Sequence, residues 1–134
     1  MADTGARPFA GALALIADPD VDAVVIASHD SVHAEQVQAA VRAGKPVLCE
    51  KPLSPTLAEA TRVLREIGTA QLVSLGFMRR FDPGYVEVRD AIDRGRIGAP
   101  VLMYNISRGD SAGPGTTSES SITGAAIHEF DVVP

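Results

Sequence analysis

The sequence contains no tryptophan, and aromatic residues make up only 4% of its 134 residues. A core built from this chain must therefore be aliphatic, with Val, Leu, Ile and Ala as its main side chains. Hydrophobic residues make up 46% and charged residues 22%, a balance typical of a folded globular protein rather than a disordered tail. The length fits one compact domain or a part of a larger one.

Cysteine is nearly absent as well. The single Cys49 has no partner for an internal disulfide, and no Cys or His residues stand at the spacing of zinc ligands, so the sequence predicts no metal site. We expect Cys49 to be a small buried hydrophobe.

Runs of basic residues and long apolar runs are also missing. Twelve Lys and Arg stand against seventeen Asp and Glu, and no basic cluster carries interleaved aromatics, which argues against a nucleic-acid partner. The longest apolar run, Ala12 to Ala17, is far shorter than the roughly 18 residues that cross a bilayer. Asp3 stands where a signal peptide would be basic. We therefore expect no membrane partner and a cytoplasmic location.

Strand and helix signals alternate in the first 76 residues, where short β-branched runs are separated by segments with apolar residues at helical spacing. We expect strands over 22–28, 46–49 and 72–75, and helices over 33–43 and from Leu57 onward, the second opened by a Thr56 capping box. Strand–helix–strand repeats with short connections form parallel sheets, and ligands bind at the carboxyl ends of the strands.

The alternation of strand and helix signals ends near Phe77, so we expect one domain over 1–76 and another over 77–134. Asp82 as N-cap and Pro83 at the first helical position predict a helix. Alternation over 101–106 indicates a strand. The Gly, Ser and Thr residues of 109–121 indicate a loop, with a short helix following from about Gly124.

The first candidate site follows the first predicted strand. Ser28, His29 and His33 are polar residues where a nucleotide would lie, near backbone N–H groups that could meet a phosphate or a ribose. The alternative is local: Asp30 or Ser31 caps the next helix and His33 lies in its first turn. The residues alone leave both readings open.

The second candidate is Glu50-Lys51-Pro52, directly after the second predicted strand. A lysine at a strand end can donate to a substrate hydroxyl and stabilise an oxyanion, and Pro52 would turn the chain rigidly. The alternative is a solvated ion pair between Lys51 and Glu50.

Further candidates lie in the second half of the chain. Arg79 and Arg80 could bind polyol hydroxyls or a cofactor phosphate, although we expect one of them to pair with Asp82. His128 and Asp131 are three residues apart and so share a helix face, where the carboxylate could orient the imidazole as a proton acceptor. The alternative is a simple ion pair on that face.

These segments, in this order, resemble the family of glucose-fructose oxidoreductase, inositol dehydrogenase and MocA. The match runs through 18–27, 33–35, 43–52, 76–85 and 127–131, and the last two segments are similar to the inositol 2-dehydrogenase branch. The resemblance implies an α/β fold: the second half of a Rossmann-type parallel sheet, then the start of an α+β substrate domain. It also implies transfer of a hydride from a ring hydroxyl of a myo-inositol-like polyol to NAD, with NADP as the alternative cofactor.

The resemblance also assigns roles. Lys51 would be the catalytic lysine, Glu50 would lie at the nicotinamide ribose, and His128 would remove the hydroxyl proton. Further cofactor contacts would come from Ser28, His29 and His33, and substrate contacts from Arg79, Arg80, Gly124 and His128. Gly124 stands where the family often has an Asp, which implies a different proton relay, a different substrate preference, or replacement of that carboxylate by Glu119 or Asp131.

The sequence departs from the family in having no Gly-x-Gly-x-x-Gly turn to hold a pyrophosphate. We therefore expect an internal piece of a longer, homo-oligomeric enzyme. By itself this chain should have no dehydrogenase activity and should bind a dinucleotide weakly. Two other functions stay open: a catalytically silent remnant or interaction module, and a dehydrogenase for another sugar.

Overall fold

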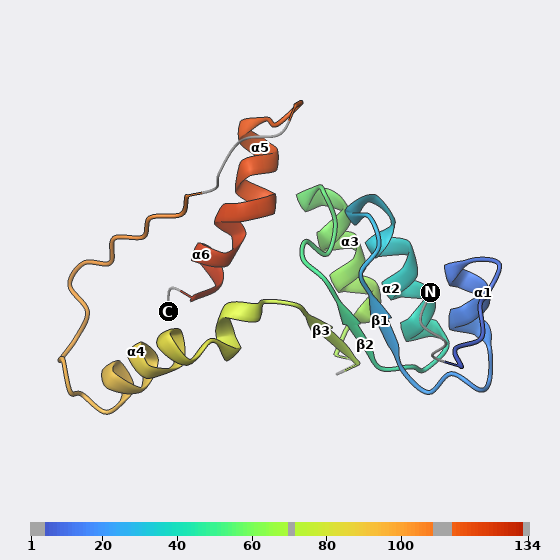
Figure 1. Ribbon diagram of the computed structural model, residues 1–134, viewed down its shortest axis with the longest axis horizontal. Coiled ribbons are helices and arrows are strands. Elements are labelled where there is room, and N and C mark those ends of the chain that lie inside the picture. Colours follow the sequence, from blue (N-terminus) through green and yellow to red (C-terminus); the bar gives the residue numbers. More distant parts are fainter. Residues whose placement is uncertain (1–4, 70–71, 109–113, 133–134) are drawn as a thin grey trace. The chain divides into compact units, whose positions relative to one another are not determined.

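A computed structural model of the chain describes residues 5–69, 72–108 and 114–132. The chain divides into two compact units, Met1–Gly76 and Phe77–Pro134. The first unit contains the strands and the second contains helices joined by extended segments (Figure 1).

The first unit is built on a three-stranded parallel sheet, which confirms the predicted sheet. Its strands are β1 (Val24–Ile26), β2 (Val47–Cys49) and β3 (Val73–Leu75), and they lie in that order across the sheet. Each strand is shorter than the range predicted for it, since only three residues of each strand pair with a neighbouring strand.

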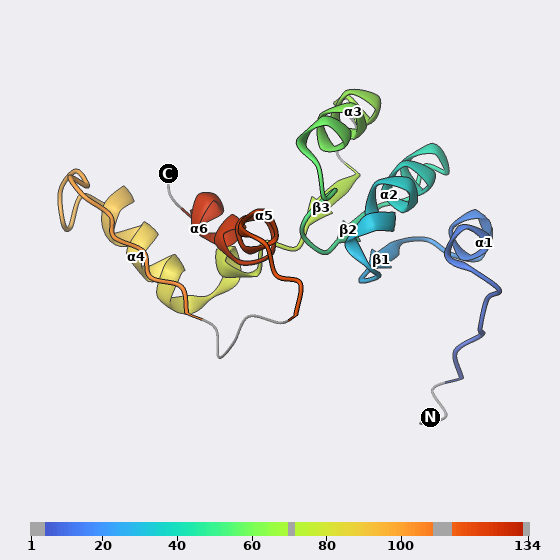
Figure 2. The same ribbon diagram turned by 90° about the horizontal axis from the view of Figure 1, so that it is seen from above.

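Both helical crossovers lie on the same face of the sheet. The strand order increases steadily from β1 to β3, so right-handed connections place α2 (His33–Arg42) and α3 (Leu57–Ile67) on one side, as Figure 2 shows. Thr56 caps α3 by accepting from the Glu59 N–H, but the Glu59 carboxylate accepts from Ser54 instead of closing the expected capping box.

The core between the sheet and these helices is aliphatic, as predicted from the composition. It holds Ile16, Val24, Ile26, Ala34, Val37, Ala40, Val47, Cys49, Leu53 and Val63. Cys49 is fully buried, which confirms its expected role, and burial together with the nearby Glu50 charge raises the pKa of its thiol to about 11. A short helix that the sequence did not predict, α1 (Ala12–Ala17), packs against α2 and adds Ile16 to this core.

The opposite face of the sheet is open. Val25, Leu48 and Ser74 are paired across the three strands, and all three are exposed, Val25 at 73%. Because Val25 and Leu48 point to this open face, the sequences of β1 and β2 are apolar at every position. Both faces of these two strands carry side chains suited to burial, and the described residues cover one face.

The second unit is helical. A 3₁₀ turn, η2 (Met78–Phe81), leads into α4 (Pro83–Asp93), where Asp82 caps the Gly84 N–H and Pro83 opens the helix as predicted. Residues 101–108 belong to no helix or strand, and later in the chain come α5 (Ser118–Ser121), a π turn, η3 (Ile122–Ala126), and α6 (Ile127–Val132).

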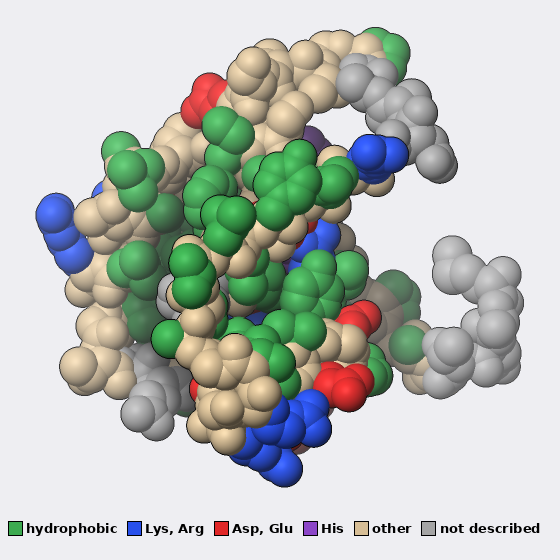
Figure 3. Space-filling model, turned by 90° about the vertical axis from the view of Figure 1, so that its left-hand side faces the viewer, with side chains coloured by type: hydrophobic (Ala, Val, Ile, Leu, Met, Phe, Trp, Pro, Cys, Tyr) green, Lys and Arg blue, Asp and Glu red, His purple; other side chains and the backbone are tan. Residues whose placement is uncertain are grey.

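Two predictions for this unit are wrong. Residues 101–106 form no strand, because no described segment pairs with them; Val101 is 98% exposed and Leu102 is 87% exposed. The predicted loop over 109–121 gives way to α5, which Thr117 starts by a reciprocal cap with Ser120; residues 109–113 lie outside the described residues. Figure 3 shows hydrophobic side chains gathered on the side where α4 and residues 101–108 lie.

Candidate functional site

The carboxyl ends of the three strands form the first part of the candidate site. Glu50 follows β2 and its N–H donates to Ile26 O at 2.8 Å; Gly76 follows β3 and its N–H donates to Cys49 O at 2.8 Å. These bonds continue the ladder one residue beyond each strand. Glu50, Lys51 and Gly76 therefore lie at one edge of the sheet, where parallel sheets bind their ligands.

The Glu50 carboxylate lies against the Gly76 backbone. A Cβ atom at Gly76 would come within 3.0 Å of Glu50 Oε2 and 3.1 Å of Oε1. Gly76 has no positive φ, so the backbone conformation does not require a glycine at this position. The absence of a side chain instead leaves room for the exposed Glu50 carboxylate at the strand ends.

Ser28 and His29, expected near a cofactor, lie on the segment after β1 and are exposed. Ser28 Oγ donates to Gln36 Oε1 at 2.9 Å. The alternative, in which these residues cap the following helix, is confirmed only in part: a side chain does cap the turn before α2, but it belongs to a different residue. The His29 ring, rather than Asp30 or Ser31, caps the 3₁₀ turn η1 (Asp30–Val32) by accepting from the Ser31 N–H, and the α2 N-cap makes no side-chain bond.

His33 occupies the first turn of α2 and is only 1% exposed. Its Nδ1 lies 2.8 Å from Pro52 O and its Nε2 lies 3.1 Å from Ser28 O. The structure thus places this predicted cofactor residue inside the unit, beneath the segments that carry Ser28 and Lys51.

Lys51 is partly buried, and the Lys51–Pro52 peptide bond is cis. Pro52 itself is buried, and its carbonyl accepts from the His33 ring. The turn after β2 is therefore anchored to the protein interior directly beside the lysine.

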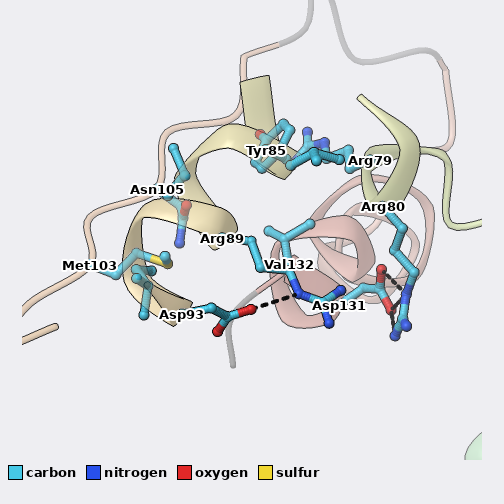
Figure 4. Close-up of a pocket in the computed structure, with 12 residues that line it drawn as sticks. Arg79, Arg80, Tyr85, Arg89, Asp93, Met103, Asn105, Asp131 and Val132 are labelled. Carbon is cyan, nitrogen blue, oxygen red and sulfur yellow. Dashed lines mark hydrogen bonds and ion pairs between the residues drawn. The ribbon is translucent and has the colours of Figure 1, made fainter. Parts of the chain in front are cut away.

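The second unit carries the two predicted arginines, and both are held by carboxylates of α6. Arg80 Nε lies 2.9 Å from each carboxylate oxygen of Asp131, and Arg80 Nη2 lies 2.6 Å from Asp131 Oδ1 (Figure 4). Arg79 forms an ion pair with Glu129, and these partners raise the pKa of each guanidinium. The expected ion pair of one arginine with Asp82 does not form: that carboxylate caps α4, and its charge is only a minor cause of the raised pKa of Arg79.

An open pocket of about 620 Å³ lies beside these ion pairs, with Tyr85 next to the Arg79 guanidinium (Figure 4). Its wall is formed by Arg79, Arg80, Tyr85, Val86, Val88, Arg89, Ile92, Asp93, Met103, Asn105, Asp131 and Val132. The pocket therefore combines aliphatic surface with guanidinium groups and an amide.

His128 is 9% exposed on α6, and its ring meets the Phe77 ring edge to face with centroids 6.2 Å apart. The Asp131 carboxylate, which was expected to orient the His128 imidazole or to pair with it, is bound by Arg80, and this contact joins α6 to η2. Gly124 lies exposed in the π turn that precedes His128.

Three contributors were missed at the sequence level: Gln36, Gly76 and Glu129. The signal for Gln36 was a polar residue on the buried face of a helix, three positions after His33. Glu129 lies beside His128 in the helix motif. Nothing in the sequence alone reveals the approach of Gly76 to Glu50, because it depends on the order of β2 and β3.

Within residues 5–69, 72–108 and 114–132, no group of three or more His, Cys, Asp and Glu side chains could hold a metal ion. None of the helices in those ranges is long and apolar enough to cross a membrane.

The sequences and structures of known proteins match this arrangement. The chain is 54% identical over 127 residues to inositol 2-dehydrogenase 2 of Paenarthrobacter aurescens, covering 90% of this chain and 38% of that protein. It is 45% identical to inositol 2-dehydrogenase of Pseudomonas syringae pv. syringae, covering 98% of this chain and 40% of that protein. The chain thus spans about two fifths of the length of these relatives.

A solved structure gives the same result in three dimensions. Myo-inositol dehydrogenase from Lactobacillus casei, in complex with NAD(H) and myo-inositol, matches with a TM-score of 0.79 and 31% identity, over 95% of this chain and 38% of that one. The family described as an oxidoreductase family with an NAD-binding Rossmann fold matches residues 1–77. With its parallel sheet and its Glu50-Lys51-Pro52 turn at the strand ends, the chain belongs to the Gfo/Idh/MocA family of oxidoreductases.

Proposed function

We propose that this chain is the part of an NAD-dependent inositol 2-dehydrogenase that supplies the nicotinamide end of the cofactor site and the residues that act on the substrate hydroxyl. The observation that carries the proposal is the strand-end edge: Lys51 beside a carboxylate that Gly76 leaves room for. The similarity to inositol dehydrogenases over 90% or more of the chain supports it.

The residues at this edge fit the ribose end of a dinucleotide. A carboxylate accepts hydrogen bonds from ribose hydroxyls, and Glu50 is exposed at the carboxyl end of β2 with its oxygens turned over Gly76. Ser28 and His29 lie at the end of the neighbouring strand and are exposed as well. We assign Glu50 to the ribose, with Ser28 and His29 beside it.

The proposed chemistry removes two hydrogens from a ring carbinol. NAD, when bound, provides the acceptor for the hydride. Lys51 donates a hydrogen bond to the substrate oxygen and stabilises the negative charge that develops there. His128 accepts the hydroxyl proton, since histidine is the side chain suited to proton transfer near neutral pH.

We assign the polyol to the side of the second unit that contains Arg79 and His128. Arg79 is paired with Glu129, and one carboxylate leaves several of its five N–H donors available to hydroxyl oxygens. Arg80, bound at both Asp131 oxygens, serves mainly to fix α6. Gly124 lies one helical turn before His128, where a missing side chain leaves room for the substrate ring.

A segment exchange tests this function. The chain replaces the matching 127-residue stretch of the Paenarthrobacter aurescens inositol 2-dehydrogenase 2, and the chimera is assayed for NADH formation with myo-inositol, scyllo-inositol and glucose. We expect NAD-dependent oxidation of myo-inositol. A chimera that folds and binds NADH but oxidises none of the three would contradict the proposal, and oxidation of glucose alone would favour the sugar dehydrogenase.

A further inference from the structure

The buried ring of His33 connects the two segments that carry the candidate cofactor and catalytic residues. The last ladder bond between β1 and β2 runs from Glu50 N–H to Ile26 O at 2.8 Å. Two residues further along each segment, the ring lies 3.1 Å from Ser28 O and 2.8 Å from Pro52 O. His33 thus continues the connection between the two strands past the point where the sheet ends.

The same helix turn holds the β1 segment a second time. Ser28 Oγ donates to Gln36 Oε1 at 2.9 Å, and Gln36 lies three residues after His33 on α2. Gln36 on α2 accepts from the Ser28 side chain, and the His33 ring on the same helix lies within hydrogen-bond distance of both the Ser28 carbonyl and the Pro52 carbonyl beside Lys51. A shift of α2 would move both segments together.

We propose that His33 is a positioning residue for Lys51. It holds the Lys51–Pro52 turn at a fixed place relative to Ser28, and it does not bind the cofactor itself. The proposal rests on the proposed function, in which Lys51 acts on the substrate oxygen. Misplacement of a catalytic group by about 1 Å can lower a rate by about 100-fold, so a buried link of this kind has a functional consequence.

The contacts of the ring argue against the role that the sequence predicted. Both ring nitrogens face carbonyl oxygens, which only accept hydrogen bonds, and the side chain is 1% exposed. A ligand at the sheet edge would find the ring behind the backbone of Ser28 and Pro52.

A simple packing role is the remaining alternative, since His33 is among the largest fully buried side chains. The substitution His33→Phe separates the two roles because it keeps an aromatic ring and removes both nitrogens. His33→Gln keeps one donor in place. Val63→Ala is the matched control, since Val63 is fully buried on α3 in the same core and its side chain makes no hydrogen bond to either segment.

The first measurement uses the ¹⁵N,¹³C-labelled 134-residue chain. With His33→Phe we expect the amide signals of His29 and Lys51 and the Lys51 Hε–Cε signal to move, and hydrogen exchange at those amides to accelerate by about tenfold or more. His33→Gln should return part of the change. The proposal is overturned if His33→Phe changes these signals no more than Val63→Ala does.

The second measurement uses the chimera defined above. His33→Phe should lower kcat by about tenfold or more while the KM for NAD stays within about threefold. A higher KM for NAD with an unchanged kcat would make His33 a cofactor ligand and overturn the proposal. A parent chimera that folds and binds NADH but is inactive would refute the proposed function, and the NMR measurement would still decide whether His33 positions Lys51.

Discussion

A Cβ atom at Gly76 would lie 3.0 Å from Oε2 of Glu50, so the position of this carboxylate depends on a residue 26 positions away in the sequence. The contact spans two neighbouring strands, β2 and β3. The absence of a side chain at Gly76 therefore allows the Glu50 carboxylate to lie at its observed position in the candidate cofactor site.

Gly76→Ala should weaken NADH binding in the chimera. The added methyl group must push the Glu50 carboxylate aside by a few tenths of an ångström, and losing part of a charged hydrogen bond costs about 1 kcal/mol, or about fivefold in Kd. The free energy of unfolding should change by less than about 1 kcal/mol, because the displaced atoms are the end of a flexible side chain.

Gly11→Ala is the matched control for this substitution. A Cβ at Gly11 meets nothing within 4 Å, and its φ of −178° is open to any residue. Fluorescence titration of NADH with both variants tests the contact. Equal affinities would show that Gly76 has no influence on the cofactor through Glu50.

The pair Arg80 and Asp131 should stabilise α6 on η2. Arg80→Leu leaves the Asp131 side chain, which is 6% exposed, without its bidentate partner, and an unpaired buried carboxylate costs about 1–3 kcal/mol. Hydrogen exchange of the α6 amides should accelerate accordingly. Arg89→Leu provides the comparison, because its pair with Asp93 is 3.6 Å long and exposed, and we expect a change below about 0.5 kcal/mol. Equal exchange in the two variants would refute this difference.

Cys49 should make stability depend on alkaline pH. The pKa of the thiol in the folded chain is raised to about 11 from an ordinary value of 9.0, so the folded state favours the protonated form. Its contribution to stability is complete below about pH 9 and is lost as the pH rises toward 11. Urea unfolding between pH 8 and about pH 11 should show this decline, and Cys49→Ala should remove that part of it. An identical decline in both proteins would contradict the assignment.

His128→Ala should change the pH dependence of NADH formation in the chimera. Without the proposed proton acceptor, the rate should fall and its profile should lose the inflection near neutral pH. A profile that keeps its shape would assign the base to another group.

The strands and two of the helix starts were predictable from the sequence because their signals are local. Thr56 caps α3 in the first unit, Asp82 caps α4 in the second unit, and the β-branched runs form the parallel strands. The prediction of a strand over 101–106 was wrong. Alternation of apolar and polar residues indicates only that one face could be buried, whereas a strand also needs a partner strand for its backbone hydrogen bonds. α1 was missed because six apolar residues are too few to show a helical period.

The location of Lys51 after the end of β2 was predictable because it follows from position along the chain. The candidate site was not predictable where partners come from distant segments. The partners of Arg79 and Arg80 lie about 50 residues further on, so a nearby Asp82 was the natural but wrong choice. Whether the polar His33 would face a ligand or the interior depended on the turn at Pro52, 19 residues away.

Lys51→Met in the chimera is the most direct test of the central claim, that Lys51 stabilises charge on the substrate oxygen at the nicotinamide end of the site. We predict that NADH formation with myo-inositol falls by about 100-fold or more, since such stabilisation contributes about 3–4 kcal/mol in comparable sites, while the Kd for NADH stays within about threefold. A steady-state rate within about threefold of the parent chimera would contradict the account.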